Sequence, residues 1–343
     1  MENRSHWIDY AKAIGIILVV YGHVARGLYK AGIEIPKEFY ELADSIVYSF
    51  HMPLFFFLSG VFFYSSFTKK GGVKLITSKI DTIVYPYIIW AITQGVIEAF
   101  LADYTNGSVT YAEVFSLLWS PRAQFWFLYA LFIVFFLAAA IFSVVSKKSA
   151  IAVFLLSAIT YVYPEIIPEG MVFKFISSNF VFFMFGIVFT LRLNAEQLSS
   201  RMSLFLLACV FSTSQFIFHH TLGLNYTDKG IASLSLALIS IFFIISLSAW
   251  GALRPHRLMT FIGTSSMAIY LMHILAGSGA RVALLTFMGI DSPTIHLVAG
   301  CFIGIFVPLL ALIVINKLKI PYIFSAPVSN IPALIQRSAN FLR

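Results

Sequence analysis

Residues 8–23, IDYAKAIGIILVVYGH, form an apolar run that carries three ionisable side chains, Asp9, Lys12 and His23. An ionisable group inside a membrane-spanning helix is costly in free energy and usually marks a functional site. Eleven helical steps separate Lys12 from His23, so both lie on one stripe of the helix, about 16 Å apart along its axis. Asp9 joins the stripe one turn earlier. The sequence therefore predicts a functional first helix with His23 as its central candidate.

The composition of the chain predicts that this helix lies in a bilayer. Of the 343 residues, 59% are hydrophobic and 11% are charged, whereas about 25% of the residues of an ordinary soluble domain are charged. A membrane-spanning helix needs about 20 mainly apolar residues, and the chain contains ten such runs. We therefore predict an all-α integral membrane protein, a single bundle of about ten transmembrane helices. Their expected cores are residues 10–28, 46–66, 82–102, 124–145, 149–164, 172–191, 202–220, 231–250, 258–277 and 296–316.

The distribution of basic residues predicts the orientation of the bundle. With a cytoplasmic N-terminus, only seven of the 23 basic residues fall in outer segments, as the positive-inside rule expects. Both termini are then cytoplasmic, and the net charge of +8 reflects orientation and attraction to anionic lipids, not nucleic-acid binding. The outer basic residues are Arg26, Lys30, Lys37, Arg122, Lys174, Lys229 and Arg281.

Neither a second domain nor a metal site is indicated. Loops are short, and no low-complexity tract interrupts the apolar runs, so residues 1–343 are expected to form one transmembrane domain without an appended extracytoplasmic domain. Cys209 and Cys301 fall in different predicted helices, and no histidine and carboxylate spacing suits a metal.

Polar residues from five predicted helices are expected at one level in the outer half of the membrane. The rise of 1.5 Å per residue sets this depth, and Arg122 and Trp126 begin the fourth helix, where they could close the layer from outside. Each residue also has a structural alternative. A histidine, Glu98 or Asn179 can hydrogen-bond a neighbouring helix, and Trp126 can anchor the interface. The five residues of the layer are His23, His51, Glu98, Asn179 and His273.

A basic cluster is expected at the inner face. Lys69, Lys70, Lys74 and Lys79 precede the third helix, and with Lys12 they could bind phosphates that arrive from the cytoplasm. The alternative is that these lysines set the topology and bind lipid headgroups.

Four segments occur in the order typical of one family: residues 8–23, HMPLFFFLSGVFF at 51–63, QFWFLYALF at 124–132 and FIGTSSMAIYLMHI at 261–274. Together they resemble the membrane-bound acyltransferase 3 family, particularly its branch of sugar O-acetyltransferases related to fucose 4-O-acetylase. The opening signature of the family is a basic residue, ten intervening residues and a histidine, which here are Lys12 and His23. Many members have arginine at the first position, and lysine offers a point charge in place of a bidentate fork.

The resemblance implies transfer of an acetyl group from cytoplasmic acetyl-CoA to a hydroxyl of a sugar in a surface or exported glycan, in a bacterial inner membrane. His23 would be the general base, because neutral imidazole accepts a hydroxyl proton near pH 7; an acetyl-histidine intermediate is the open alternative. The implied catalytic residues are His23, Lys12 and Asp9. The implied acetyl-CoA contacts are Lys12, Lys74 and Lys79, and the implied acceptor contacts are His51, Glu98, Arg122, Trp126, Asn179 and His273.

A multi-pass transporter or flippase of a polar or lipid-linked solute is the alternative function. The same histidines and Glu98 would then relay protons or bind cargo. Expected partners of the enzyme are acetyl-CoA, the glycan acceptor and membrane lipids, and homo-oligomers or glycan-assembly proteins stay open.

Overall fold

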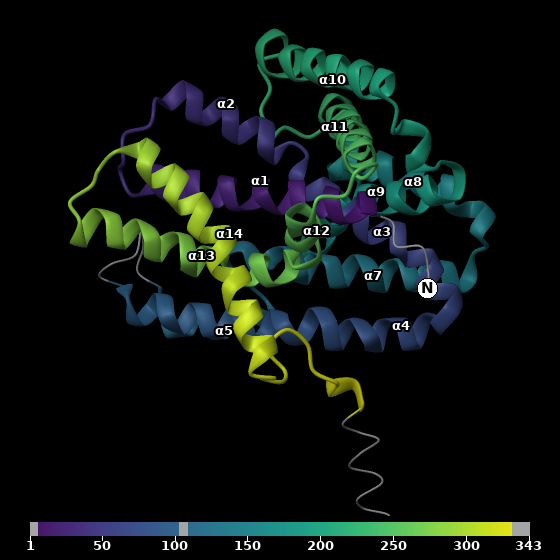
Figure 1. Ribbon diagram of the computed structural model, residues 1–343. Coiled ribbons are helices and arrows are strands. Elements are labelled where there is room, and N and C mark those ends of the chain that lie inside the picture. The colour runs from purple at the N-terminus through teal and green to yellow at the C-terminus, as the bar shows by residue number, and fades with distance from the viewer. Residues whose placement is uncertain (1–5, 103–108, 331–343) are drawn as a thin grey trace, which may run out of the picture. The chain divides into compact units, whose positions relative to one another are not determined.

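The computed structural model describes residues 6–102 and 109–330, and all of its regular elements in these ranges are helices (Figure 1). The protein is an all-α, multi-pass membrane protein. Nine helical segments of the described ranges are long and apolar enough to cross a membrane. They are His6–Lys30, Lys37–Lys70, Gly72–Phe100, Tyr111–Val144, Met171–Arg192, Arg201–Thr221, Ile231–Gly251, Ser266–Phe287 and Pro293–Lys317.

The fifth expected span, residues 149–164, is a shorter helix. It is α8 (Ala150–Val162), with 13 residues. At 1.5 Å per residue this helix extends about 20 Å, less than the roughly 30 Å of a hydrocarbon core. Within the described residues, nine helices are therefore long enough to cross a membrane, whereas the sequence predicts ten spans.

Contacts between residues divide the chain into two compact units, Met1–Phe62 with Ala150–Val314 and Phe63–Ser149 with Ile315–Arg343. A single functional domain over residues 1–343 stays a prediction.

In the first unit, α1 is an unbroken helix surrounded by other helices. It packs against α2, α11, α12 and α13, and the side chains of Ile16, Val19 and Val20 are at most 2% exposed. The ionisable side chains that α1 carries are costly to expose to lipid, which accounts for its place among the other helices of the unit. The helices of the unit are α1 (His6–Lys30), α2 (Lys37–Tyr48), the first half of α3 (His51–Lys70), α8, α9 (Met171–Arg192), α10 (Arg201–Phe216), α11 (Ile231–Gly251), α12 (Arg257–Thr264), α13 (Ser266–Val282) and most of α14 (Pro293–Lys317).

Two glycines let α3 and α9 approach each other closely. A Cβ atom at Gly60 would lie 2.0 Å from the backbone oxygen of Phe183, and one at Gly186 would lie 2.1 Å from that of Phe57. Membrane helices associate mainly through such close packing, because lipid tails are as apolar as the side chains. Gly60 is therefore a packing residue, as its sequence context FLSG suggests.

In the second unit, the segment after α14 folds back against the start of the third expected span, over residues 81–90. Tyr85 and Trp90 donate hydrogen bonds to the backbone oxygens of Tyr322 and Ile323, at 2.8 and 2.9 Å. The Ser329 hydroxyl donates to a carboxylate oxygen of Asp81 at 2.7 Å. The helices of the unit include α4 (Gly72–Lys79), the π-helical turn η1 (Ile80–Val84), α5 (Tyr85–Phe100), α6 (Tyr111–Phe115) and α7 (Trp126–Val144).

Candidate active site

The ring of His23, on α1, lies against the ring of His273, on α13. The ring centroids are 5.1 Å apart, and the planes are tilted by 58°. His23 is partly exposed, whereas His273 is 1% exposed. Among the described residues, the ring nitrogens of His23 have no hydrogen-bond partner. Two histidines that the sequence places at one depth, from distant parts of the chain, are therefore in contact.

The backbone determines which nitrogen of His273 carries the hydrogen. Its Nδ1 lies 2.8 Å from the carbonyl oxygen of Tyr270 and 3.1 Å from that of Ile269. Because a carbonyl oxygen only accepts hydrogen bonds, the hydrogen of the neutral ring is on Nδ1. Nε2 is left as an acceptor, and it is buried without a partner in the described part of the chain.

His51, at the start of α3, has the same tautomer. Its Nδ1 lies 2.8 Å from the carbonyl oxygen of Val47, so Nε2 carries the lone pair. The rings of His51 and Tyr48 meet in a T-shaped arrangement, with centroids 4.4 Å apart. A Cβ atom at Gly22 would lie 2.8 Å from the Tyr48 ring, so the glycine before His23 makes room for this tyrosine. His51 is also close enough to His23 for an electrostatic interaction.

Arg26, one turn beyond His23, lies at the candidate site, although its position in the sequence indicates only the topology of the bundle. Its Nε and Nη2 donate to the two carboxylate oxygens of Asp44, at 2.7 and 2.8 Å. The guanidinium lies 3.3 Å from the ring centroid of Tyr48 and 5.1 Å from that of Tyr226. An arginine within a membrane span normally pairs with another group, and this rule was the available signal. The pair holds α1 and α2 together beside His23.

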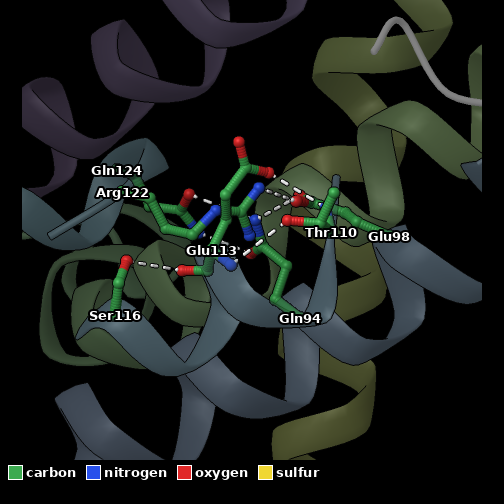
Figure 2. Close-up of polar contacts among 7 residues, drawn as sticks. All are labelled: Gln94, Glu98, Thr110, Glu113, Ser116, Arg122 and Gln124. Carbon is green, nitrogen blue, oxygen red and sulfur yellow. Dashed lines mark hydrogen bonds and ion pairs between the residues drawn. The ribbon is translucent and has the colours of Figure 1, made fainter. Parts of the chain in front are cut away.

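In the second unit, four predicted or neighbouring polar residues bind one another (Figure 2). Arg122 donates to Glu98 at 2.8 Å. Gln94 donates to the other oxygen of Glu98 at 2.7 Å, and the amides of Gln94 and Gln124 exchange hydrogen bonds of 2.6 and 3.3 Å. Buried polar groups are stable when their bonds are satisfied in this way. The network favours the structural alternative for Glu98, and acceptor contacts by Glu98 and Arg122 stay predictions.

Two further predicted acceptor contacts have local partners. Asn179 is buried in α9 and donates to the backbone oxygen of Phe175, at 2.8 Å. Trp126 begins α7, with its ring 6.4 Å from that of Phe127. Their roles in binding an acceptor stay predictions.

The residues that the sequence predicts at the inner face contact aromatic rings or are exposed. Lys12 Nζ lies 5.3 Å from the ring centroid of Phe62, and Lys79 Nζ lies 4.3 Å from that of Phe135. Such contacts are cation–π interactions. Lys74 is exposed, which leaves its ammonium accessible to an anion.

The buried carboxylate Asp9 lies on the same helix as Lys12. It is 8% exposed, and a Cβ atom at Gly263 would lie 1.8 Å from its backbone oxygen. The backbones of α1 and α12 therefore touch at Asp9. Within residues 6–102 and 109–330, no three histidine, cysteine or acidic side chains gather as a metal site.

Residues 5–313 match the model of a known family, described as acyltransferase domain, Acyl_transf_3. The chain belongs to the acyltransferase 3 family. The resemblance drawn from Lys12, His23 and the four sequence segments is thereby confirmed. As an acyltransferase 3 protein, the chain has its paired histidines, His23 and His273, inside the matched region.

Two curated relatives of this acyltransferase 3 protein are both named nodulation protein NolL. The relative from Sinorhizobium fredii is 26% identical over 214 residues, which cover 61% of this chain and 55% of the relative. The relative from Mesorhizobium japonicum is 28% identical over 141 residues, which cover 40% of this chain and 35% of the relative. The chain therefore spans about half of the first relative and about a third of the second. No solved structure matches the chain.

Proposed function

We propose that this protein is a membrane O-acyltransferase that moves an acetyl group from acetyl-CoA to a hydroxyl of a sugar in a surface or exported glycan. The observation that carries the proposal is a partly exposed histidine, His23, at the signature position of an acyltransferase 3 helix and beside two buried histidines. We further propose that the protein acts in the cytoplasmic membrane of a bacterium, with both termini in the cytoplasm.

His23 is proposed as the general base. Its ring nitrogens are uncommitted among the described residues, so one of them can take the proton of an acceptor hydroxyl while the oxygen attacks the thioester carbon. The thiolate of the donor then leaves and takes this proton from His23. The thiol and the ester are the products.

His51 suits contact with the acceptor better than stabilisation of the oxyanion. An oxyanion needs hydrogen-bond donors aimed at it, whereas the hydrogen of the His51 ring is committed to the backbone oxygen of Val47. The remaining nitrogen accepts, and a sugar hydroxyl is a donor that fits it.

The acyl donor is proposed to approach from the cytoplasmic end of α1. Because α1 is unbroken from His6 to Lys30, Lys12 and His23 keep their separation of about 16 Å along the axis. An extended thioester arm can cover this distance, with the phosphates of acetyl-CoA at Lys12. Lys74 and Lys79 stay predicted phosphate contacts, as ammonium groups pair well with phosphate.

The test is transfer of radiolabelled acetyl groups from acetyl-CoA to glycan by membranes that contain equal amounts of wild-type or variant protein. His23→Ala is expected to lower transfer at least about 100-fold, the usual contribution of a general base. His220→Ala is the matched control, since His220 is exposed and in contact with Phe216, and it should transfer normally.

Equal transfer by His23→Ala and wild type would refute the role of His23. Absence of transfer by the wild type, together with flux of a glycan precursor in sealed vesicles, would favour the transporter.

A further inference from the structure

His273 Nε2 is a buried hydrogen-bond acceptor without a partner, directly beside the proposed base. We propose that His273 is a positioning residue, which accepts a hydrogen bond from a ring N–H of His23 and so selects the tautomer of His23. The other nitrogen of His23 then faces the acceptor hydroxyl as an unprotonated base. The catalytic role inferred for His273 rests on the proposed function, whereas the hydrogen bond between the two histidines does not depend on it.

Burial decides which group can serve as the donor. The Nε2 atom of His273 has almost no exposed surface, and the residue is 1% exposed. A substrate hydroxyl in an open site therefore does not reach this atom. The ring of His23 is in contact with His273, and the residue His23 is partly exposed. His23 thus connects the accessible side of the site with the buried acceptor.

The geometry allows the bond to form without movement of the helices. The centroids of the two rings are 5.1 Å apart, and the χ2 torsion of a histidine has a broad energy profile. Rotation of the His23 ring about this torsion turns a nitrogen toward His273 Nε2. The His273 ring does not turn in response, because two backbone oxygens hold its Nδ1. The packing of α1 on α13 keeps the two rings together.

The resulting series of hydrogen bonds specifies the position of every proton. The backbone oxygen of Tyr270 accepts from His273 Nδ1, and His273 Nε2 accepts from one nitrogen of His23. When an acceptor hydroxyl attacks the thioester, its O–H bond breaks, and the proton moves to the free nitrogen of His23. The O–C bond forms, the C–S bond breaks, and the departing sulfur takes that proton. His273 stays neutral throughout, in the place that a carboxylate has in a serine protease triad.

Other titratable groups also act on His23 and belong in the design of a test. Arg26 and Lys30 on α1 and His51 on α3 interact with it electrostatically, and Asp44 on α2 is held by Arg26. None of them is altered by substitution of His273. Loss of the hydrogen bond to His273 is therefore expected to alter the tautomer of His23, and this tautomer is the quantity to measure.

The experiment measures this tautomer by ¹⁵N solid-state NMR of histidine-labelled protein in lipid bilayers, with the His23 signals assigned by their loss in His23→Ala. The wild type and His273→Gln, which keeps an acceptor at a similar reach, are expected to show one neutral tautomer of His23. His273→Leu has no acceptor and should show a mixture. His273→Asn, whose amide is shorter, is a second test if the leucine variant does not fold, and it should also show a mixture.

Acetyl transfer by the same variants supplies the second readout. In His273→Leu, kcat is expected to fall about 100-fold, since loss of the triad orienter has effects of this size or greater, while KM for acetyl-CoA changes less than about threefold. His273→Gln should recover most of kcat. The same tautomer ratio in all variants, or full kcat in His273→Leu, would overturn the proposal. Because the NMR measurement needs no turnover, inactivity of the wild type would refute the proposed function alone.

Discussion

Replacement of Gly186 by alanine is expected to force α3 and α9 apart and to destabilise the protein. A Cβ atom at this position would lie 2.1 Å from the backbone oxygen of Phe57 and 2.8 Å from the backbone nitrogen of Val61. Ordinary contacts of a Cβ atom begin at 3.4 Å, so the missing distance to the oxygen is 1.3 Å, 3.4 less 2.1. Neither obstacle is the end of a flexible side chain, so the helices themselves must move.

The magnitude follows from the contacts that this movement opens. A gap of 0.5–1 Å forfeits about a quarter to a half of each van der Waals well, and overpacking of a dense interior costs roughly 1–3 kcal/mol. The crossing also holds aromatic pairs, with the ring of Phe57 at 5.2 Å from Phe185 and 5.4 Å from Phe189. We therefore expect a loss of about 3 kcal/mol, near the upper end of that range, and a decrease in Tm of about 4 °C.

The assay is thermal unfolding of the purified protein in one detergent, with Gly27→Ala as the matched control. Gly27 is also helical, and apart from its chain neighbours and the backbone of its own helix no atom lies within 4 Å of its ideal Cβ position. There, alanine should leave Tm unchanged or raise it, because alanine favours a helix by up to about 1 kcal/mol over glycine. Equal Tm values for the two variants would refute the argument from close backbone contact.

Gly60→Ala provides an internal check of the same crossing. Its Cβ atom would lie 2.0 Å from the backbone oxygen of Phe183, so the single variant should resemble Gly186→Ala. The double variant should lose less than the sum of the two single losses, because the first substitution already separates the helices. Strict additivity would indicate two independent sites.

Two further predictions concern charged residues. Arg122→Leu should lower the stability by about 2 kcal/mol, because Glu98, whose side chain is 18% exposed, loses its ion-pair partner. Glu98→Gln added to this variant should restore part of the lost stability. Additive effects of the two substitutions on Tm in a double-mutant cycle would contradict the coupling. Lys229 is exposed, but partial desolvation beside the Tyr161 ring and the like charge of Lys174 lower its pKa. A water-soluble reagent should therefore acylate the Lys229 amine at a lower pH than an ordinary lysine, and mass spectrometry measures the extent of this acylation. Lys174→Gln should shift the pH midpoint of the acylation upward. An unchanged midpoint would exclude the contribution of Lys174.

The residues that the sequence places at one depth do not all contact one another in the structure. His23 and His273 are in contact, and His51 is near them, as a common layer in the first unit would require. Glu98 instead pairs with Arg122. Depth follows from the helix rise alone, whereas the partner depends on the rotation of each helix about its axis. Depth in the membrane therefore predicts which residues could be in contact, but the rotation of the helices decides which of them are.

The short helix α8 shows a second difference between pattern and structure. Residues 149–164 are apolar enough to suggest a span, but Pro164 begins a separate 3-10 turn directly after this helix ends. The residue before a proline is disfavoured in the helical conformation, and this local rule accounts for the early end.

The sequence by itself determined the class of the protein, most of its helices, its family and the stripe of Lys12 and His23. The class, the helices and the stripe depend on local composition and helical periodicity, and the family follows from the resemblance of four sequence segments. None of these depends on the path of the chain in space. Only the tertiary structure decided that the buried acceptor of His273 lies beside His23, that Arg26 binds Asp44, and that Gly60 and Gly186 sit at one helix crossing. Each of these contacts joins residues from different helices, and it forms only when packing determines how the helices turn and how closely their backbones approach.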